Sequence, residues 1–259
     1  KGKAIANKTG KITIDGVEYP ITTDANGAAS INLSLTTGNY TASVHTVSDY
    51  YNKAGNVEAA ITVEDDRNVT ELTAASKTIY LKTIASGYKY SVTLKDGEGK
   101  ALANKDITIV FNGSTYSATT NANGIATVTL NATKTGSLNA AISFNGDDDY
   151  TPATKTATIK ITKEASKITA SKKTFKAKTK TKKYTITLKS KSGKAIAKAK
   201  VTLKVKGKTY KATTTSKGKA TFKITKLTKT GKHKAVIKFA GNTYYNSASK
   251  TVKYITVKK

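Results

Sequence analysis

The sequence predicts an all-β fold made of tandem β-sandwich domains, and three observations support this. Apolar and polar residues alternate, Thr, Ser, Val and Ile are frequent, and only 2 of the 259 residues are Pro. One frame, G-x-x-Y-x-x-T-T-x-x-x-G-x-A, occurs at 16–29, 113–126 and 207–220. The copies are about 95 residues apart, with frequent turn signals between, as a seven-stranded sandwich requires.

Within each copy, the strand pattern separates an inward face from an outward face. Residues 106–113 and 200–207 are predicted to be strands. Further along each copy we expect a turn with a positive φ at Gly27, Gly124 or Gly218. The predicted inward residues of the first strand are Ile107, Ile109 and Phe111, and Val201, Leu203 and Val205. Those of the strand after the turn are Ala29, Ile31 and Leu33; Ala126, Val128 and Leu130; and Ala220, Phe222 and Ile224.

The repeated tyrosines Tyr19, Tyr116 and Tyr210 have two interpretations. They could form a binding platform, or they could pack at the edge of each core. We favour edge packing, because aromatic residues at a fixed place in a strand frame usually serve the core.

The three copies begin differently, which predicts an incomplete first domain. We assign repeat one to residues 1–65, repeat two to 66–163 and repeat three to 164–259, with linkers near 64–69 and 162–167. Repeat one lacks the residues for its first two strands, so core and ladder groups would be open to water. Either the chain is a fragment of a longer array, as we favour, or another chain adds the missing strand. The absence of Met and the start at Lys1 also indicate a mature product or a fragment.

Three motifs carry a resemblance that covers nearly the whole chain. They are the hairpin TTDANGAASINLSL, the strand G-x-Y-T-A-S-V, and the late element found as FNGDDDYTPA (144–153) and FAGNTYYNSA (239–248). With the lysine-rich end, they resemble the tandem immunoglobulin-like repeats of adhesin-like surface proteins of methanogenic archaea. The resemblance implies immunoglobulin-like sandwiches in an extracellular stalk or adhesive array on the cell envelope. Such turn and core motifs specify a fold and no ligand.

The positive charge is concentrated in repeat three. Repeat one carries 5 Lys and 7 acids, repeat two carries 11 basic and 8 acidic residues, and repeat three carries 29 Lys and one acid, Glu164. Because repeats two and three share one inward pattern, we expect the lysines to serve a partner and not the fold. The lysines that we assign to anionic-surface binding are Lys200, Lys204, Lys206, Lys208, Lys211, Lys223, Lys234 and Lys238.

An anionic cell-wall polymer or envelope surface is the expected partner of these lysines. So many like charges repel one another unless anions screen them. Lysine acts as a compact point charge, whereas nucleic-acid recognition usually employs Arg and stacking aromatic residues, and repeat three has no Arg. Nucleic acid is therefore disfavoured, and a role of charge in solubility or spacing remains the alternative.

No catalytic set, cofactor site or metal site is predicted. The chain has no Cys, and its two histidines, His45 and His233, lie on matching strands without neighbouring carboxylates. The run Asp147, Asp148 and Asp149 could bind Ca²⁺, but the corresponding loops do not repeat the acids, so we expect a solvated loop. A Lys–Asn or Lys–Asp isopeptide crosslink is improbable in repeat three and stays open in repeat two.

Six Asn-x-Ser/Thr sequons could carry glycans, although most would arise by chance in a chain so rich in Thr and Ser. They are Asn7, Asn32, Asn39, Asn68, Asn112 and Asn131, all outside repeat three. A carbohydrate-binding module would need exposed aromatic residues, and only Tyr50, Tyr51, Tyr244 and Tyr245 suggest one.

The sequence thus predicts a non-enzymatic, adhesin-like stalk or spacer outside the cell, whose third repeat attaches to an anionic polymer. No apolar run is long enough for a membrane span. The alternative is a filament subunit, in which a strand from a neighbouring copy completes repeat one.

Overall fold

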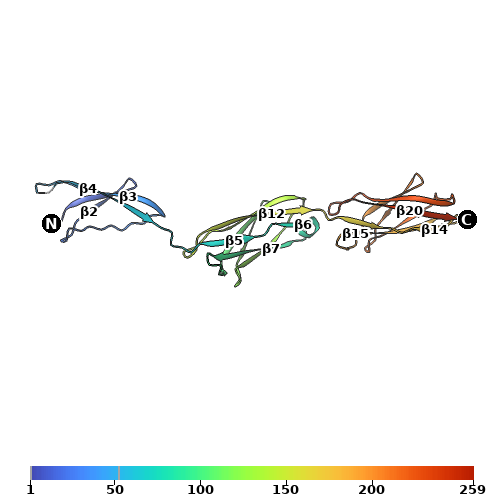
Figure 1. Ribbon diagram of the computed structural model, residues 1–259, viewed down its shortest axis with the longest axis horizontal. Coiled ribbons are helices and arrows are strands. Elements are labelled where there is room, and N and C mark those ends of the chain that lie inside the picture. Colours follow the sequence, from blue (N-terminus) through green and yellow to red (C-terminus); the bar gives the residue numbers. More distant parts are fainter. Residues whose placement is uncertain (1, 52) are drawn as a thin grey trace. The chain divides into compact units, whose positions relative to one another are not determined.

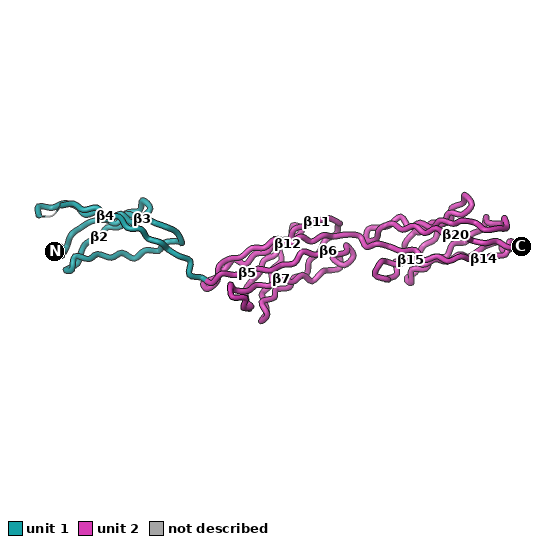
Figure 2. The backbone as a smooth tube through the Cα atoms, viewed as in Figure 1, with its two compact units in different colours: residues 1–67 teal, residues 68–259 magenta. Residues whose placement is uncertain are grey.

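The computed structural model describes residues 2–51 and 53–259, so Lys1 and Asn52 lie outside the description. It has two compact units, residues 1–67 and 68–259 (Figure 2). Strands β1 to β20 make up almost all of the regular structure, with one short helix, α1 (Leu81–Ile84) (Figure 1). None of the helices in the described residues is long and apolar enough to cross a membrane. The predicted all-β fold is confirmed.

Repeat two is an immunoglobulin-like sandwich of two sheets. Its first edge strand is divided between the sheets, because β5 pairs with β7 in one sheet and β6 pairs in parallel with β12 in the other. The three-stranded sheet has the order β10 (Ile125–Leu130), β7 (Tyr88–Asp96), β5 (Thr70–Ala74). The five-stranded sheet has the order β6 (Lys77–Tyr80), β12 (Ala153–Thr162), β11 (Gly136–Phe144), β8 (Asp106–Phe111), β9 (Ser114–Thr119).

Repeat three has the same topology. Its three-stranded sheet has the order β13 (Ser166–Thr169), β15 (Lys182–Ser190), β18 (Lys219–Ile224). Its five-stranded sheet has the order β14 (Lys173–Lys176), β20 (Ala248–Lys258), β19 (Gly231–Phe239), β16 (Lys200–Val205), β17 (Lys208–Thr213). Strand β14 runs parallel to β20, as β6 does to β12. The shared frame in the sequence therefore corresponds to a shared pairing of strands.

Repeats two and three each bury a separate hydrophobic cluster between their sheets. The inward residues predicted for these two repeats are all buried, and Tyr116 and Tyr210 pack partly buried against the clusters, as the edge-packing interpretation predicts. Two separate cores agree with one domain per repeat. The boundaries 1–65, 66–163 and 164–259 remain our proposal.

Repeat one forms a single four-stranded sheet in the order β2 (Val17–Thr22), β1 (Thr9–Ile14), β3 (Gly38–Thr46), β4 (Gly55–Val63). The strand predicted after Gly27 does not form: Ala29 is exposed, and Ile31 and Leu33 are only half-buried. This prediction was wrong because the corresponding strand β10 is held by hydrogen bonds to β7. The described residues of repeat one contain no counterpart of β7.

The missing sheet leaves apolar groups of repeat one exposed. Leu102 and Ile196 are 4% and 2% exposed in the sandwiches, and each donates its backbone N–H to β7 or β15. Ile5, at the same place in repeat one, is 42% exposed. Ala59 is likewise exposed, whereas its counterpart Ala157 is 1% exposed. One face of the sheet in repeat one is therefore open.

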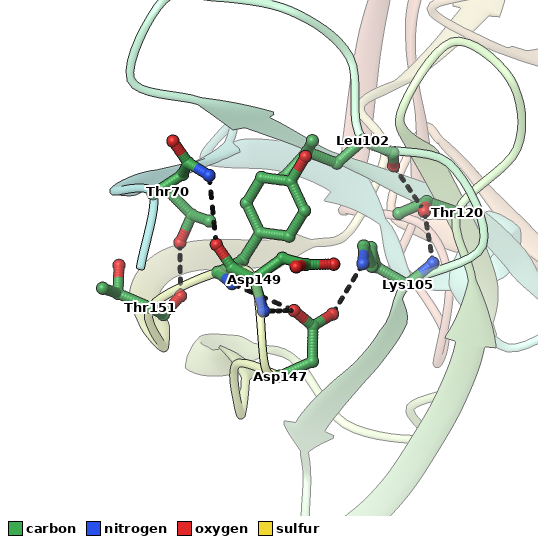
Figure 3. Close-up of polar contacts among 9 residues, drawn as sticks. Thr70, Leu102, Lys105, Thr120, Asp147, Asp149 and Thr151 are labelled. Carbon is green, nitrogen blue, oxygen red and sulfur yellow. Dashed lines mark hydrogen bonds and ion pairs between the residues drawn. The ribbon is translucent and has the colours of Figure 1, made fainter. Parts of the chain in front are cut away.

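A threonine of the shared T-T pair fixes the same loop in all three repeats. In repeat two the Thr120 hydroxyl accepts a hydrogen bond from the Lys105 N–H at 2.9 Å and donates one to the Leu102 carbonyl at 2.6 Å (Figure 3). Thr23 and Thr214 make the corresponding pairs of bonds. These bonds satisfy backbone groups that lie outside the sheet ladders.

Gly218 is required by close approach as well as by conformation. Its φ is +72°, and a Cβ there would lie 2.4 Å from the Leu188 carbonyl oxygen. Gly193 has a φ of +84° but open space around it. We expect Gly218→Ala to destabilise repeat three by at least about 2 kcal/mol more than Gly193→Ala. Alanine is strained by the positive φ at both positions, but only at Gly218 does its Cβ also clash with a neighbouring backbone atom. Urea unfolding of the full chain, followed by circular dichroism, measures this. Equal losses would contradict the close-approach account.

Candidate functional site

All eight lysines assigned to anionic-surface binding are exposed. Four of them share the outer face of the five-stranded sheet of repeat three, where they alternate with buried or half-buried residues: Lys200 and Lys204 on β16, Lys211 on β17 and Lys238 on β19. Lys234 lies on β19 beside the bulge between His233 and Ala235. Half of the assigned set therefore lies together on one face.

The other three lysines do not belong to that face. Lys206 is in the turn between β16 and β17, with a φ of +45°. Lys208 pairs with the inward residue Val205, so strand alternation turns it away from the outer face. Lys223 lies on the three-stranded sheet opposite Lys183. The positive charge thus coats both sides of the sandwich.

Glu164, the single acid of repeat three, anchors the start of the repeat and does not neutralise the lysine face. Its carboxylate accepts a hydrogen bond from the Ser192 N–H at 2.8 Å, and its backbone bonds to Tyr244 and Asn246. Burial raises the pKa of Glu164, but hydrogen bonds from Ser192 and Ser190 outweigh burial, so the pKa lies below its ordinary value.

One lysine of repeat three does serve the fold, which corrects our expectation. Lys182 is 1% exposed, and its Nζ donates hydrogen bonds to the carbonyl oxygens of Thr179 at 2.7 Å and Ala177 at 3.3 Å. It pairs with Ile224, where repeat two pairs Tyr88 with Leu130. The period of two that buries Tyr184 also places Lys182 inward, and this signal was present in the sequence.

Repeats one and two share an ion pair that repeat three lacks. Lys105 Nζ lies 2.6 Å from Asp147 Oδ2 (Figure 3), and Lys8 Nζ lies 2.6 Å from Asp49 Oδ2. Our comparison of the loops missed that Asp49 corresponds to Asp147. Ala199 and Asn242 occupy these two positions in repeat three.

The turn is kept although the ion pair is lost. Asp147 Oδ1 accepts backbone hydrogen bonds from Asp149 and Tyr150, and Asn242 Oδ1 accepts the same bonds from Tyr244 and Tyr245. Repeat three therefore retains the side-chain oxygen that shapes the turn and drops the carboxylate charge. The paired lysine is lost together with the acid, so the exchange leaves the net charge of the repeat unchanged.

The first acid of the run Asp147, Asp148 and Asp149 is paired with Lys105. The hydrogen bond from Lys105 is the main cause that lowers the pKa of Asp147, and the same bond raises the pKa of Lys105. Amide formation needs a neutral amine and a protonated carboxyl group, so this pair is in the opposite state to that of a crosslinking site. Among the described residues, no group of three or more His, Asp or Glu side chains could hold a metal ion.

The histidines occupy matching strands but different positions on them. On β3, His45 Nδ1 contacts Asn56 Oδ1, while on β19 His233 Nε2 contacts the Lys229 carbonyl oxygen at 2.8 Å. His45 lies seven residues after Gly38, and His233 lies two residues after Gly231. The two side chains therefore do not form a repeated site.

The four loop tyrosines have different environments. Tyr50 and Tyr51 are 92% and 88% exposed, with ring centroids 4.9 Å apart in an edge-to-face arrangement. Tyr244 is partly exposed, but Tyr245 is 4% exposed and joins the core of repeat three. The suggestion that all four could contact a glycan is wrong for Tyr245.

All six sequon asparagines are exposed, so a glycan at any of them would reach solvent. They are Asn7, Asn32, Asn39, Asn68, Asn112 and Asn131. Their modification remains a prediction.

No protein-family model matches the sequence, and no curated protein matches it. Among solved structures, a Ca²⁺-stabilised adhesin with which an Antarctic bacterium binds ice is 19% identical, covering 99% of this chain and 66% of its own, with a TM-score of 0.31. Invasin, a bacterial integrin-binding protein, is 21% identical over 71% of this chain and 39% of its own, with a TM-score of 0.41. Titin domains A168–A170 are 8% identical over 73% and 65%, with a TM-score of 0.43. These similarities concern the fold class alone.

We expect Asp147→Asn to lower the free energy of unfolding of repeat two by about 0.2–1 kcal/mol near neutral pH, because a half-exposed ion pair at the surface is lost and the turn is kept. The folded-state pKa of Asp147 lies below 3.8, so the contribution is complete above that value and is lost as the pH falls through the folded pKa. Urea unfolding of the full chain at several pH values measures this. A difference from the wild type that persists in strong acid would contradict the assignment.

Proposed function

We propose that the chain is a non-enzymatic, adhesin-like stalk or spacer on the cell surface, and that repeat three attaches it to an anionic envelope polymer. The observation that carries this proposal is the placement of 29 Lys and one acid on repeat three, whose framework is the same as that of repeat two. A framework that folds with an ordinary surface in repeat two does not need this coat.

The physical cost of the coat supports a partner. Lysines on neighbouring strands repel one another, and this repulsion opposes folding unless anions neutralise it. The replacement of the Lys–Asp pair by Ala199 and Asn242 leaves the net charge of repeat three unchanged, so its excess of positive charge comes from lysines at other positions. Lysine point charges suit attachment without sequence recognition, and such attachment weakens with salt.

The repeats act as spacers in this proposal. Repeats two and three each bury a core of their own, so length can grow by addition while the outer faces vary. The resemblance to repeats of methanogen surface proteins supports an extracellular location on a cell wall, and the exposed sequons are compatible with it. We include an archaeal cell envelope in the proposal on the basis of this resemblance.

Retention on isolated cell walls tests the attachment. We expect the full chain to be retained at low salt and released as salt rises, and a chain of residues 1–163 to be lost under all these conditions. Circular dichroism of the shortened chain confirms that repeat two is still folded. Equal retention of both chains at low salt would contradict the proposal.

A second candidate function is that of a filament subunit, favoured by the open face of repeat one. Ile5 is 42% exposed where the sandwiches bury Leu102 and Ile196, and the segment after Gly27 has no strand partner. An added strand with the alternation of β7, which buries Tyr90, Val92 and Leu94, would cover Ile5 and pair with the segment after Gly27. In this alternative a neighbouring copy supplies that strand.

Assembly in solution tests this alternative. We expect sedimentation velocity to detect species larger than the monomer as concentration rises. A peptide of residues 69–97 should dissociate these oligomers, because it carries the strands that repeat one lacks and competes for its open face. A peptide of the same composition in scrambled order serves as the control. A monomer at every concentration, with no binding of the peptide, would contradict strand addition.

A further inference from the structure

A row of alternating lysine and hydroxyl side chains crosses the outer face of repeat three. Lys211 on β17 pairs with Thr202 on β16, Thr202 pairs with Lys238 on β19, and Lys238 pairs with Ser249 on β20. Paired residues on neighbouring strands point to the same side of a sheet. Because strands lie about 4.8 Å apart, the Cα atoms of Lys211 and Lys238 are roughly 10 Å apart, with a hydroxyl between them.

The two lysines of the row are specific to repeat three. The corresponding row of repeat two has four hydroxyl residues and no charge: Ser117, Thr108, Ser143 and Thr154. That of repeat one is Pro20, Lys11, His45 and Asn56. Repeat three keeps the hydroxyls at the second and fourth places and has lysine at the first and third.

The row borders a groove of about 900 Å³ on the same repeat. Three lysines and four hydroxyl residues contribute to its lining: Lys200, Lys211, Lys238, Thr202, Thr213, Ser247 and Ser249. Lys200 lies two residues before Thr202 on β16 and so faces the same side. In repeat two the place of Lys200 is taken by Asp106, which would repel an anion. A volume of this size is within the range of ligand sites.

The hydroxyls of the row are able to serve a ligand. The Thr202 hydroxyl donates to the Lys238 carbonyl oxygen at 3.5 Å, and the Ser249 hydroxyl donates to the Ile237 carbonyl oxygen at 3.4 Å. Both distances are long for hydrogen bonds between oxygen atoms. A better acceptor can therefore replace these carbonyls at little cost.

We infer that this groove binds a glycan that carries sulfate or phosphate groups, with Lys200, Lys211 and Lys238 around the anionic groups and the hydroxyls of Thr202 and Ser249 donating to their oxygens. The inference rests on the proposed function and locates it at one face of repeat three. A tetrahedral oxyanion presents several acceptor oxygens at once, which suits a mixed set of ammonium and hydroxyl donors.

Nucleic acid fits this groove less well than a glycan does. Stacking of bases needs exposed aromatic rings, but Phe239, the aromatic residue of the groove lining, is 3% exposed. Bidentate contacts to bases are usually made by Arg, which repeat three does not contain. The lysines and hydroxyl residues of the lining are suited to the oxygens of an anionic sugar chain.

Two variants of equal charge test the inference in the full chain. Lys211→Ser with Lys238→Ser gives the row the serines of repeat two, while Lys167→Ser with Lys189→Ser removes a facing pair from the three-stranded sheet, outside the lysines assigned to binding. The probes are immobilised dextran sulfate, dextran phosphate, uncharged dextran and duplex DNA, each over a range of salt. Melting followed by circular dichroism checks that both variants are folded.

We expect the row variant to bind the charged dextrans about tenfold more weakly than the wild type, and its log–log salt slope to fall by about two. The control variant should lose less than about threefold. The charged dextran that binds more tightly identifies the anionic group. Equal losses in both variants, with the wild type still binding, would overturn the groove and leave the proposed function standing.

Two other results would have different meanings. Failure of the wild type to bind either charged dextran would overturn the proposed function itself. Binding of duplex DNA as tight as that of the charged dextrans, and equally dependent on the row, would overturn the glycan as ligand class.

Transfer of the lysines gives an independent test. Asp106→Lys with Ser117→Lys and Ser143→Lys rebuilds the three lysines on repeat two, and we expect tighter binding to the same charged dextran. No gain in binding by this folded variant would overturn the assignment of the ligand to this row.

Discussion

The packing of a three-stranded sheet against a five-stranded sheet is the constraint on which the rest of the structure depends. It requires every second residue of the inner strands, such as Leu203 and Phe222, to be buried, and it leaves the type of the intervening, outward residues unrestricted. Most inward residues of repeat three are apolar, and the ammonium group of the inward Lys182 is satisfied by carbonyl oxygens. The outer residues could therefore be exchanged for lysine without loss of the core.

Repeat one shows what this constraint costs when it is not met. Its five-stranded sheet is reduced to four strands, and its other sheet is missing from the described residues. The segment after Gly27 has the alternation of a strand but no neighbour to bond, so it stays outside the sheet. Local pattern is thus insufficient to make a strand when the ladder partner is lacking.

Most of the fold could be predicted from the sequence because the repeated frame reports the buried face and the turns directly. Two features could not be predicted in this way: the absence of the strand at Ile31 depended on a distant partner, and the match of Asp49 with Asp147 depended on the turn geometry. The inward place of Lys182 follows from the period of two, but the carbonyl oxygens that accept from its ammonium group belong to a neighbouring loop. The lysines of the candidate site were predicted, but their rows were not, because a row is defined by strand pairing.

The melting of repeat three in the presence of a sulfated or phosphorylated glycan tests the central claim most directly. A ligand that binds only the folded state raises its stability in proportion to its affinity and concentration. If the lysines serve attachment, the glycan will raise the melting temperature of repeat three and leave that of repeat two unchanged, at equal ionic strength. The same shift in both repeats, or no shift in either, would contradict it.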